Sequence, residues 1–283
     1  MPADLHYHFD VLFWVALLEG AYLLAVWPLR RRFGWAEAVD PTKVCLFSLG
    51  VCIIYLAEGT YLHDLSEKYL FSIHMVQHLL ITMAVPPLLL AGTPDWLARV
   101  LLRPAVLLKM ARLLTHPIVA LFLFNGILTF WHIPEFYNLT LTVHEIHIVE
   151  HITFITAAIV MWSPIMSPLP EVPRLPYLGQ LVYLFAQSFV PVVIGGIATF
   201  ADQTVYTAYE SAPRLWGISV ATDQQVGGLI MKVLGTLILW VAITVVFFTW
   251  FNKEEAESPH RKTLKWEDVE DELETMGLTK KQP

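Results

Sequence analysis

Cysteine and charged residues are both scarce in this sequence. The only two cysteines, Cys45 and Cys52, form no CxxC pair, so neither a disulfide framework nor dithiol redox chemistry is supported. Charged residues make up 15% of the chain, compared with about 25% in an ordinary soluble domain. The formal net charge is −7, whereas nucleic-acid binding requires a basic face. We therefore expect neither a thiol oxidoreductase nor a nucleic-acid-binding protein.

Apolar residues, in contrast, are abundant. They make up 56% of the 283 residues, and the mean hydropathy is +0.56. A membrane-spanning helix requires about 20 mostly apolar residues. Seven stretches meet this requirement: 11–29, 44–62, 70–91, 117–134, 143–165, 179–200 and 225–251. The predicted fold is an all-α membrane protein, a bundle of seven transmembrane helices surrounded by lipid.

The positions of the basic residues predict the orientation of the spans. Residues 1–10 contain no Lys or Arg, and Arg30-Arg31-Arg32 follows the first span, which argues against a cleaved signal and places the N-terminus outside. The inner loops then hold nine basic residues and the outer loops two, Lys68 and Arg214. We therefore predict a cytoplasmic C-terminus. Residues 1–252 would form the membrane domain and residues 253–283 a charged cytoplasmic tail, in which 265–269 could start a short helix.

One segment between the spans has a different pattern. Residues 96–114 alternate apolar and basic positions, which predicts an amphipathic helix lying on the inner membrane face.

The histidines are distributed unevenly across this topology. Of eleven, nine fall at or near the outer face: His6, His8, His63, His74, His78, His132, His144, His147 and His151. His74 and His78 are four residues apart, which puts both imidazoles on one helix face, and His144, His147 and His151 form a stripe on another helix. Imidazole suits Zn, Cu, Fe and Ni. We predict that His74, His78, His147 and His151 converge on one metal ion, if their helices are neighbours.

Other residues could complete or support such a site. The thioethers of Met75 and Met231 would favour Cu(I). His132 and His144 are possible additional ligands, and Asp202 and Asp223 could orient an imidazole through a hydrogen bond. Taken singly, His6, His8 and His63 are more typical of interfacial hydrogen-bonding groups. Glu19, Glu58, Asn125 and Gln187 lie inside spans, where hydrogen bonds between helices are the expected role.

A family resemblance rests on several short motifs in a fixed order. These are His74-Met75-Val76-Gln77-His78 followed by Pro86-Pro87, then Phe130-Trp131-His132-Ile133-Pro134 with Tyr137, Glu150-His151, Trp162-Ser163-Pro164, Thr199-Phe200-Ala201-Asp202 with Tyr206, and Asp223-Gln224-Gln225-Val226-Gly227-Gly228 through Met231. Over roughly residues 10–252 the chain resembles the multi-span, Bacillus-type CtaG family of cytochrome c oxidase assembly factors. Lys232 departs from the apolar residue expected beside Met231 in that family.

The resemblance implies a function in oxidase assembly. It implies a multi-pass protein of the bacterial plasma membrane that helps copper reach a haem–copper oxidase, with the oxidase subunits as partners and no turnover chemistry. The chain could also form a homo-oligomer with further copies of itself. Three alternatives remain: a haem-binding membrane protein, a zinc-dependent membrane metalloenzyme with Glu145, Glu150 or Asp202 as base, and a metal-free assembly scaffold.

Overall fold

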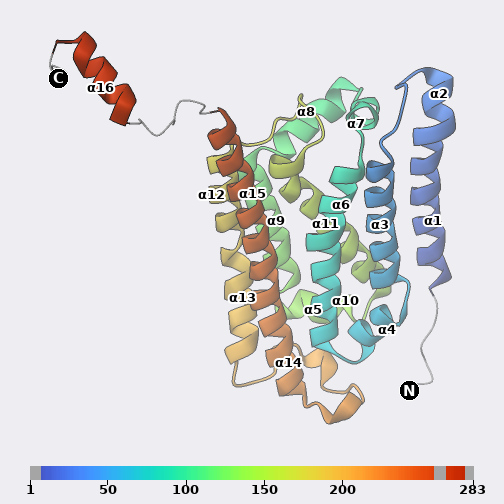
Figure 1. Ribbon diagram of the computed structural model, residues 1–283. Helices are drawn as coiled ribbons and strands as arrows, with labels where there is room; N and C mark the ends of the chain where they lie inside the picture. Colours follow the sequence, from blue (N-terminus) through green and yellow to red (C-terminus); the bar gives the residue numbers. More distant parts are fainter. Residues whose placement is uncertain (1–7, 258–265, 278–283) are drawn as a thin grey trace. The chain divides into compact units, whose positions relative to one another are not determined.

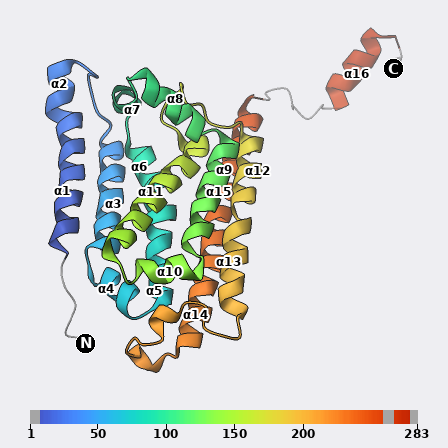
Figure 2. The ribbon, with the colours of Figure 1, turned by 180° about the vertical axis from the view of Figure 1, so that it is seen from behind.

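Every regular element in the described part of the chain is a helix (Figures 1 and 2). The computed structural model describes residues 8–257 and 266–277. The chain divides into two compact units, Met1–Ile243 and Thr244–Pro283. The α-helices are α1 (Phe9–Leu24), α2 (Arg30–Phe33), α3 (Pro41–Glu58), α4 (Tyr61–Lys68), α5 (Phe71–Leu79), α6 (Val85–Gly92), α7 (Asp95–Leu101), α8 (Ala105–Leu114), α9 (Pro117–Trp131), α10 (Pro134–Thr140), α11 (His144–Met166), α12 (Tyr177–Gln187), α13 (Phe189–Phe200), α14 (Val220–Leu229), α15 (Gly235–Glu257) and α16 (Trp266–Thr275).

Six helical segments are long and apolar enough to cross a membrane. They are Phe9–Phe33, Pro41–Glu58, Phe71–Gly92, His144–Met166, Tyr177–Phe200 and Val220–Ala256. A seventh span results if α8 and α9, which meet at 74°, are counted together, because α9 alone has only 15 residues. Six of the seven predicted stretches therefore match a single continuous segment, and the stretch 117–134 matches a helix shorter than expected. The protein is a multi-pass membrane protein.

Three spans contain a wider, π-helical turn: Ala25–Leu29, Leu80–Ala84 and Ile230–Leu234. Pro28 lies inside the first of these turns, and Pro86 and Pro87 follow the second. Proline lacks an amide hydrogen and clashes with the preceding turn, so the helix must widen or bend nearby. The span continues on both sides of the first two turns, as expected for prolines tolerated inside a bundle, whereas the third turn has no proline nearby in the sequence.

The amphipathic segment 96–114 is two helices, α7 and α8, and not one continuous helix. Pro104 causes the break, because the residue before a proline is disfavoured in the α conformation and proline itself cannot donate the helical hydrogen bond. Pro104 instead precedes the first turn of α8. The amphipathic character persists in α8, where Val106, Met110 and Leu113 are exposed.

Opposite ends of the first unit differ in their residues. Helices α2, α7 and α8 lie at one end, and α4 and α10 lie at the other, together with the start of α14 (Figures 1 and 2). Arg30, Arg31 and Arg32 form most of α2, and Lys109 and Arg112 lie on α8. The histidine-bearing first turns of α5 and α11 adjoin the α4 and α10 end, opposite this basic end.

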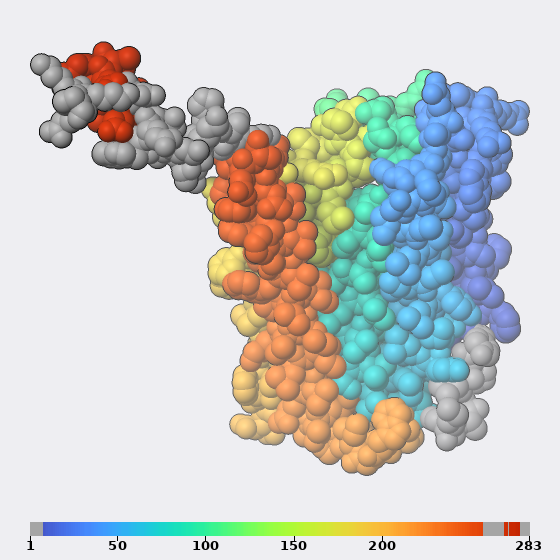
Figure 3. All heavy atoms as spheres, viewed as in Figure 1, coloured from blue at the N-terminus to red at the C-terminus, as the bar shows by residue number. Residues whose placement is uncertain are grey.

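Apolar side chains cover the outside of the helices as well as the interior. Phe13, Phe122 and Val182 are all more than 60% exposed, which is typical of a lipid-facing surface. Inside, α3 packs against α6, and the atoms of these two helices lie side by side on the face drawn in Figure 3. Gly195 of α13 and Gly228 of α14 let two backbones approach closely, since a Cβ on Gly195 would lie 2.6 Å from the Gly228 carbonyl oxygen.

Candidate metal centre

Helix α5 presents two of the predicted ligands, His74 and His78, one turn apart. A buried carboxylate sets where this helix begins: Asp223 accepts hydrogen bonds from the backbone amides of Phe71 and Ser72 at 2.7 and 3.1 Å. It also accepts one from the Ser72 hydroxyl at 2.5 Å. These bonds satisfy amides that a helix N-terminus leaves free. Both imidazoles are buried, and their Nε2 atoms lie 2.7 Å apart.

Helix α11 presents the other two predicted ligands with the same spacing. The Nε2 atoms of His147 and His151 lie 2.9 Å apart, and both rings are buried. Glu150, between them in sequence, is completely buried. Its carboxylate contacts the Thr140 side chain, and one carboxylate oxygen lies 3.7 Å from His78 Nε2.

The two pairs of histidines meet across the interface between α5 and α11. The ring centroids of His74 and His147 are 5.8 Å apart, and those of His78 and His151 are 5.4 Å apart. Ligand atoms from His74, His147, Glu150 and His151 all lie within 4.8 Å of one another, close enough to hold a single ion. His78 borders this group through its contact with His74. The fold thus brings all four predicted histidines together and adds Glu150, which the sequence had suggested only as a base.

Carboxylates from α3 and α4 contact the two α11 histidines at Nδ1, the ring nitrogen that does not face the other histidine. Glu58 lies 2.7 Å from His151 Nδ1, and Glu67 hydrogen-bonds with His147 Nδ1. A carboxylate on Nδ1 directs the other ring nitrogen towards a metal and fixes its tautomer. A neutral imidazole that donates its only proton through Nδ1 presents a bare lone pair at Nε2. The facing Nε2 atoms of His147 and His151 are therefore suited to binding a cation.

A second possible ligand group shares His147. It consists of His63, Glu67 and His147, with ligand atoms that also lie within 4.8 Å of one another. The rings of His63 and His147 stack, with centroids 5.2 Å apart. Gln77 connects this group to α3, because its Nε2 lies 3.0 Å from His63 Nδ1 and 3.2 Å from Glu58. His63 is thus part of the buried cluster and not the isolated hydrogen-bonding group that its position in the sequence suggested.

The α4 residues have the charge states that metal ligands require. Burial lowers the pKa of His63 to about 4, so its imidazole is neutral at pH 7. Burial alone would raise the pKa of Glu67, but the hydrogen bond from His147 and the nearby histidines lower it to about 2. Neutral nitrogen and anionic oxygen donors suit a transition-metal ion.

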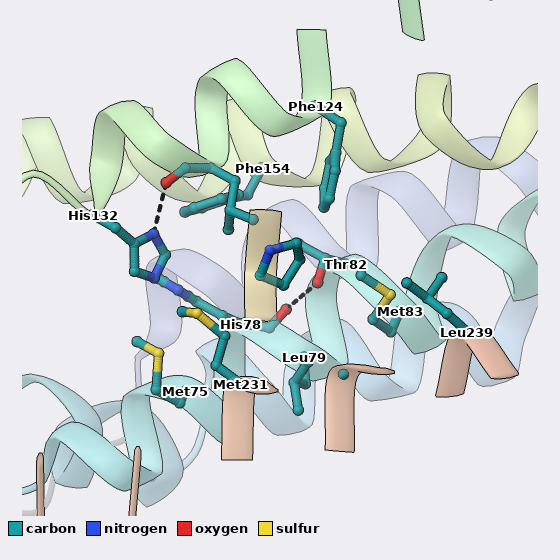
Figure 4. Close-up of a pocket in the computed structure, with 13 residues that line it drawn as sticks. Met75, His78, Leu79, Thr82, Met83, Phe124, His132, Phe154, Met231 and Leu239 are labelled. Atoms are coloured by element: carbon teal, nitrogen blue, oxygen red, sulfur yellow. Dashed lines mark hydrogen bonds between the residues drawn. The ribbon is translucent and has the colours of Figure 1, made fainter. Parts of the chain in front are cut away.

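The other candidate residues divide into two groups. His132, Met75 and Met231 are buried and line a cavity together with His78 (Figure 4). His144 and Asp202 are exposed, and among the described residues no hydrogen bond links them to the cluster. Asp202 and Asp223 were both expected to orient an imidazole, but the buried Asp223 caps α5. His6 lies outside the described residues.

All four polar residues expected to bond between helices do so. The Ser48 hydroxyl donates to Glu19 at 2.5 Å, and Asn125 donates to Gln187 at 2.7 Å. Glu58 bonds to Gln77 on α5 and to His151 on α11, so it belongs to the histidine cluster as well. The sequence did contain a signal for this role of Glu58. A carboxylate inside an apolar span is costly unless it is paired, and it therefore indicates a function.

Comparison with known proteins agrees with the predicted family. The family model for the cytochrome c oxidase caa3 assembly factor matches residues 20–253. The chain is also 26% identical over 244 residues to an uncharacterized protein of Mycobacterium bovis, a match that covers 81% of this chain and 35% of that protein. An uncharacterized protein of Mycobacterium leprae is 24% identical over 201 residues, covering 65% of this chain and 30% of that protein.

The match to these mycobacterial proteins is partial, since the chain spans about a third of their length. No solved structure matches. The family model, in contrast, covers most of this chain, including every residue of the histidine cluster. The chain therefore belongs to the family of cytochrome c oxidase caa3 assembly factors.

Proposed function

We propose that this protein binds copper in the buried histidine–glutamate cluster and passes it to a haem–copper oxidase subunit during assembly. The ligands would be His74, His147, Glu150 and His151, with His78 at the border of the site. A buried site of this kind must hold the ion firmly yet release it by ligand exchange. The protein would act as a carrier and not as an enzyme.

One observation carries this proposal. His147 and His151 each contact a carboxylate through Nδ1, and their Nε2 atoms face each other at 2.9 Å. Two bare lone pairs at that distance repel each other unless a cation, either a proton or a metal ion, lies between them. Glu150 beside them is completely buried, and a buried carboxylate is costly unless a cation compensates its charge. A metal ion would satisfy all three side chains.

The distribution of charge supports a site on the extracytoplasmic side. The basic residues of α2 and α8 lie at the end of the first unit opposite the histidine cluster. Basic residues favour the cytoplasmic side. We therefore propose that the N-terminus is outside and the C-terminus cytoplasmic in a bacterial plasma membrane, with residues 1–252 as the membrane domain and 253–283 as a cytoplasmic tail.

The direct test is the copper content of detergent-purified protein. We expect copper to bind the wild type with defined stoichiometry and to be lost from the double variant His74→Ala with His147→Ala. The matched control is His144→Ala, an exposed histidine on the same helix α11, which should keep its copper. Equal copper in all three proteins would refute the site.

A second readout connects binding to function. In cells lacking the native gene, the double variant should fail to restore the activity of the haem–copper oxidase, whereas His144→Ala should restore it. Normal oxidase activity with the double variant would favour a metal-free scaffold. A Soret absorption band in the purified wild type would favour haem, and bound zinc with metal-dependent hydrolysis would favour the enzyme alternative.

A further inference from the structure

A small cavity lies beside the histidine–glutamate cluster, deeper in the bundle. Its volume is about 30 Å³, and apart from two histidines and Thr82 its lining is apolar or sulfur-bearing. The histidines are His78 and His132, and the sulfur-bearing residues are Met75, Met83 and Met231. Figure 4 shows Met75 and Met231 beside His78 and His132 at one end, with Met83 towards Leu239. All five side chains are at least nine-tenths buried.

The hydrogen bonds of His132 determine which of its nitrogens is available. Its Nδ1 lies 2.7 Å from the carbonyl oxygen of Leu128, which can only accept, so Nδ1 carries the proton. Nε2 of the neutral ring is then a bare lone pair, and it has no hydrogen-bond partner among the described residues. A backbone carbonyl on one ring nitrogen is a common way of orienting the other towards a metal.

His78 has an unpartnered nitrogen as well. Its Nε2 is directed towards the first cluster, 2.7 Å from His74 Nε2 and 3.7 Å from Glu150. Its Nδ1 has no hydrogen-bond partner in the described part of the chain. The rings of His78 and His132 have centroids 5.9 Å apart. The two residues that carry these unpartnered nitrogens both line the cavity, and buried polar groups are rarely left unsatisfied.

We propose that this cavity is a second metal site, specific for monovalent copper, with ligands from His78, His132, Met75 and Met231. Thioether sulfur is a soft ligand that selects Cu(I). All four ligands are neutral, so the site would hold a single positive charge in apolar surroundings, where a divalent ion would cost far more to bury. The carboxylates Glu58, Glu67 and Glu150 contact the other cluster and do not line this cavity.

The two sites would differ in the ions that they prefer. The histidine–glutamate cluster offers nitrogen and anionic oxygen, which suits divalent ions, whereas the cavity offers nitrogen and sulfur. His78 borders both sites and is the one residue that could exchange between them. The inference of a second site rests on the proposed function in one respect only, namely that copper is the ion that the protein carries.

The test compares two ions and two pairs of substitutions in the full-length, detergent-purified protein. The wild type should bind Cu(I) under anaerobic, reducing conditions, with sulfur scattering in its copper X-ray absorption spectrum. The variant Met75→Leu with Met231→Leu should lose one equivalent of Cu(I) and the sulfur signal, and keep its Co(II) binding. The control Met161→Leu replaces a buried methionine outside the cavity and should change neither. Leucine conserves the volume, so folding is expected to survive, and retained Co(II) binding would demonstrate it.

Several outcomes would overturn this inference. Cu(I) bound by the wild type without sulfur scattering would do so, and so would sulfur scattering that persists in the double methionine variant. Unchanged Cu(I) stoichiometry in that variant would mean that a water molecule, at most, fills the cavity. The reciprocal variant, His147→Ala with Glu150→Gln, should lose Co(II) but keep the Cu(I)–sulfur signal. Failure of Co(II) binding in the wild type would count against the histidine–glutamate cluster alone.

Discussion

His151 Nδ1 lies 2.7 Å from a carboxylate oxygen of Glu58, a residue 93 positions earlier in the chain. This contact joins the end of α3 to the first turns of α11, and it directs the other nitrogen of His151 towards His147. Glu58 also receives a hydrogen bond from Gln77 on α5 at 3.2 Å. One carboxylate thus contacts both of the helices that supply the candidate ligands.

Glu58→Gln should weaken metal binding without abolishing it. Glutamine keeps the size of the side chain but removes the charge that holds the Nδ1 proton of His151, and loss of such a supporting contact typically costs about 10–100-fold in metal affinity. Competition with a chromophoric chelator would measure the change. The control is Glu19→Gln, which alters a span carboxylate bonded to Ser48 and not to a histidine. An equal loss in both variants would contradict a specific role for Glu58.

Glu150→Gln should have opposite effects on the metal-free and metal-loaded protein. The carboxylate is completely buried, so replacing its charge with a neutral amide should stabilise the metal-free protein. The same change removes a ligand, so the rise in apparent melting temperature on adding metal should shrink. Thermal unfolding in detergent, with and without metal, measures both. A less stable metal-free variant with an undiminished metal shift would refute this role.

Asp223→Ala should destabilise the protein and reduce its metal affinity together. Asp223 is 2% exposed and accepts two backbone amides at the start of α5, and buried hydrogen bonds to a charged group contribute about 1.5–3 kcal/mol. Loss of the cap should also let His74 and His78 move.

The matched control for Asp223 is Asp40→Ala. Asp40 caps α3 from an exposed position at the opposite end of the first unit, so its loss should cost about 1 kcal/mol and leave metal affinity unchanged. Thermal unfolding and the chelator assay would be run on both variants. Unchanged affinity in Asp223→Ala would show that α5 does not depend on this cap to place its histidines.

Gly195→Ala should weaken the contact between α13 and α14. The added Cβ would lie 2.6 Å from the carbonyl oxygen of Gly228, which is backbone and cannot rotate away, so overpacking should cost about 1–3 kcal/mol. Gly196→Ala is the control, because its Cβ would have no neighbour within 4 Å. Apparent melting temperatures would show a loss for the first variant only. A similar loss in both would mean that helix flexibility, and not close approach, requires glycine here.

Local patterns in the sequence accounted for most of the helices and for the paired histidines. A run of about 20 apolar residues has few alternatives to a membrane helix, and residues four apart must share a helix face. The break at Pro104 was readable in principle, because proline restricts its own neighbourhood. The shortness of α9 was harder to predict, since it depends on where the chain turns between α8 and α10.

Local sequence patterns could not predict which other residues belong to the histidine–glutamate cluster. Glu58, His63 and Glu67 come from α3 and α4, and nothing in their spacing relates them to His147 or His151. Sequence spacing likewise does not relate His132, at the end of α9, to Met231, in the turn before α15, although both line the cavity.

The sequence by itself determined that the chain crosses a membrane and that two helices each carry an imidazole pair, because hydropathy and helical periodicity act over a few neighbouring residues. Only the tertiary structure decided which carboxylates contact those imidazoles and which nitrogens lack partners. Those contacts depend on the packing of α3, α4, α9 and α11 around α5, which is set by long-range side-chain complementarity and not by any local pattern.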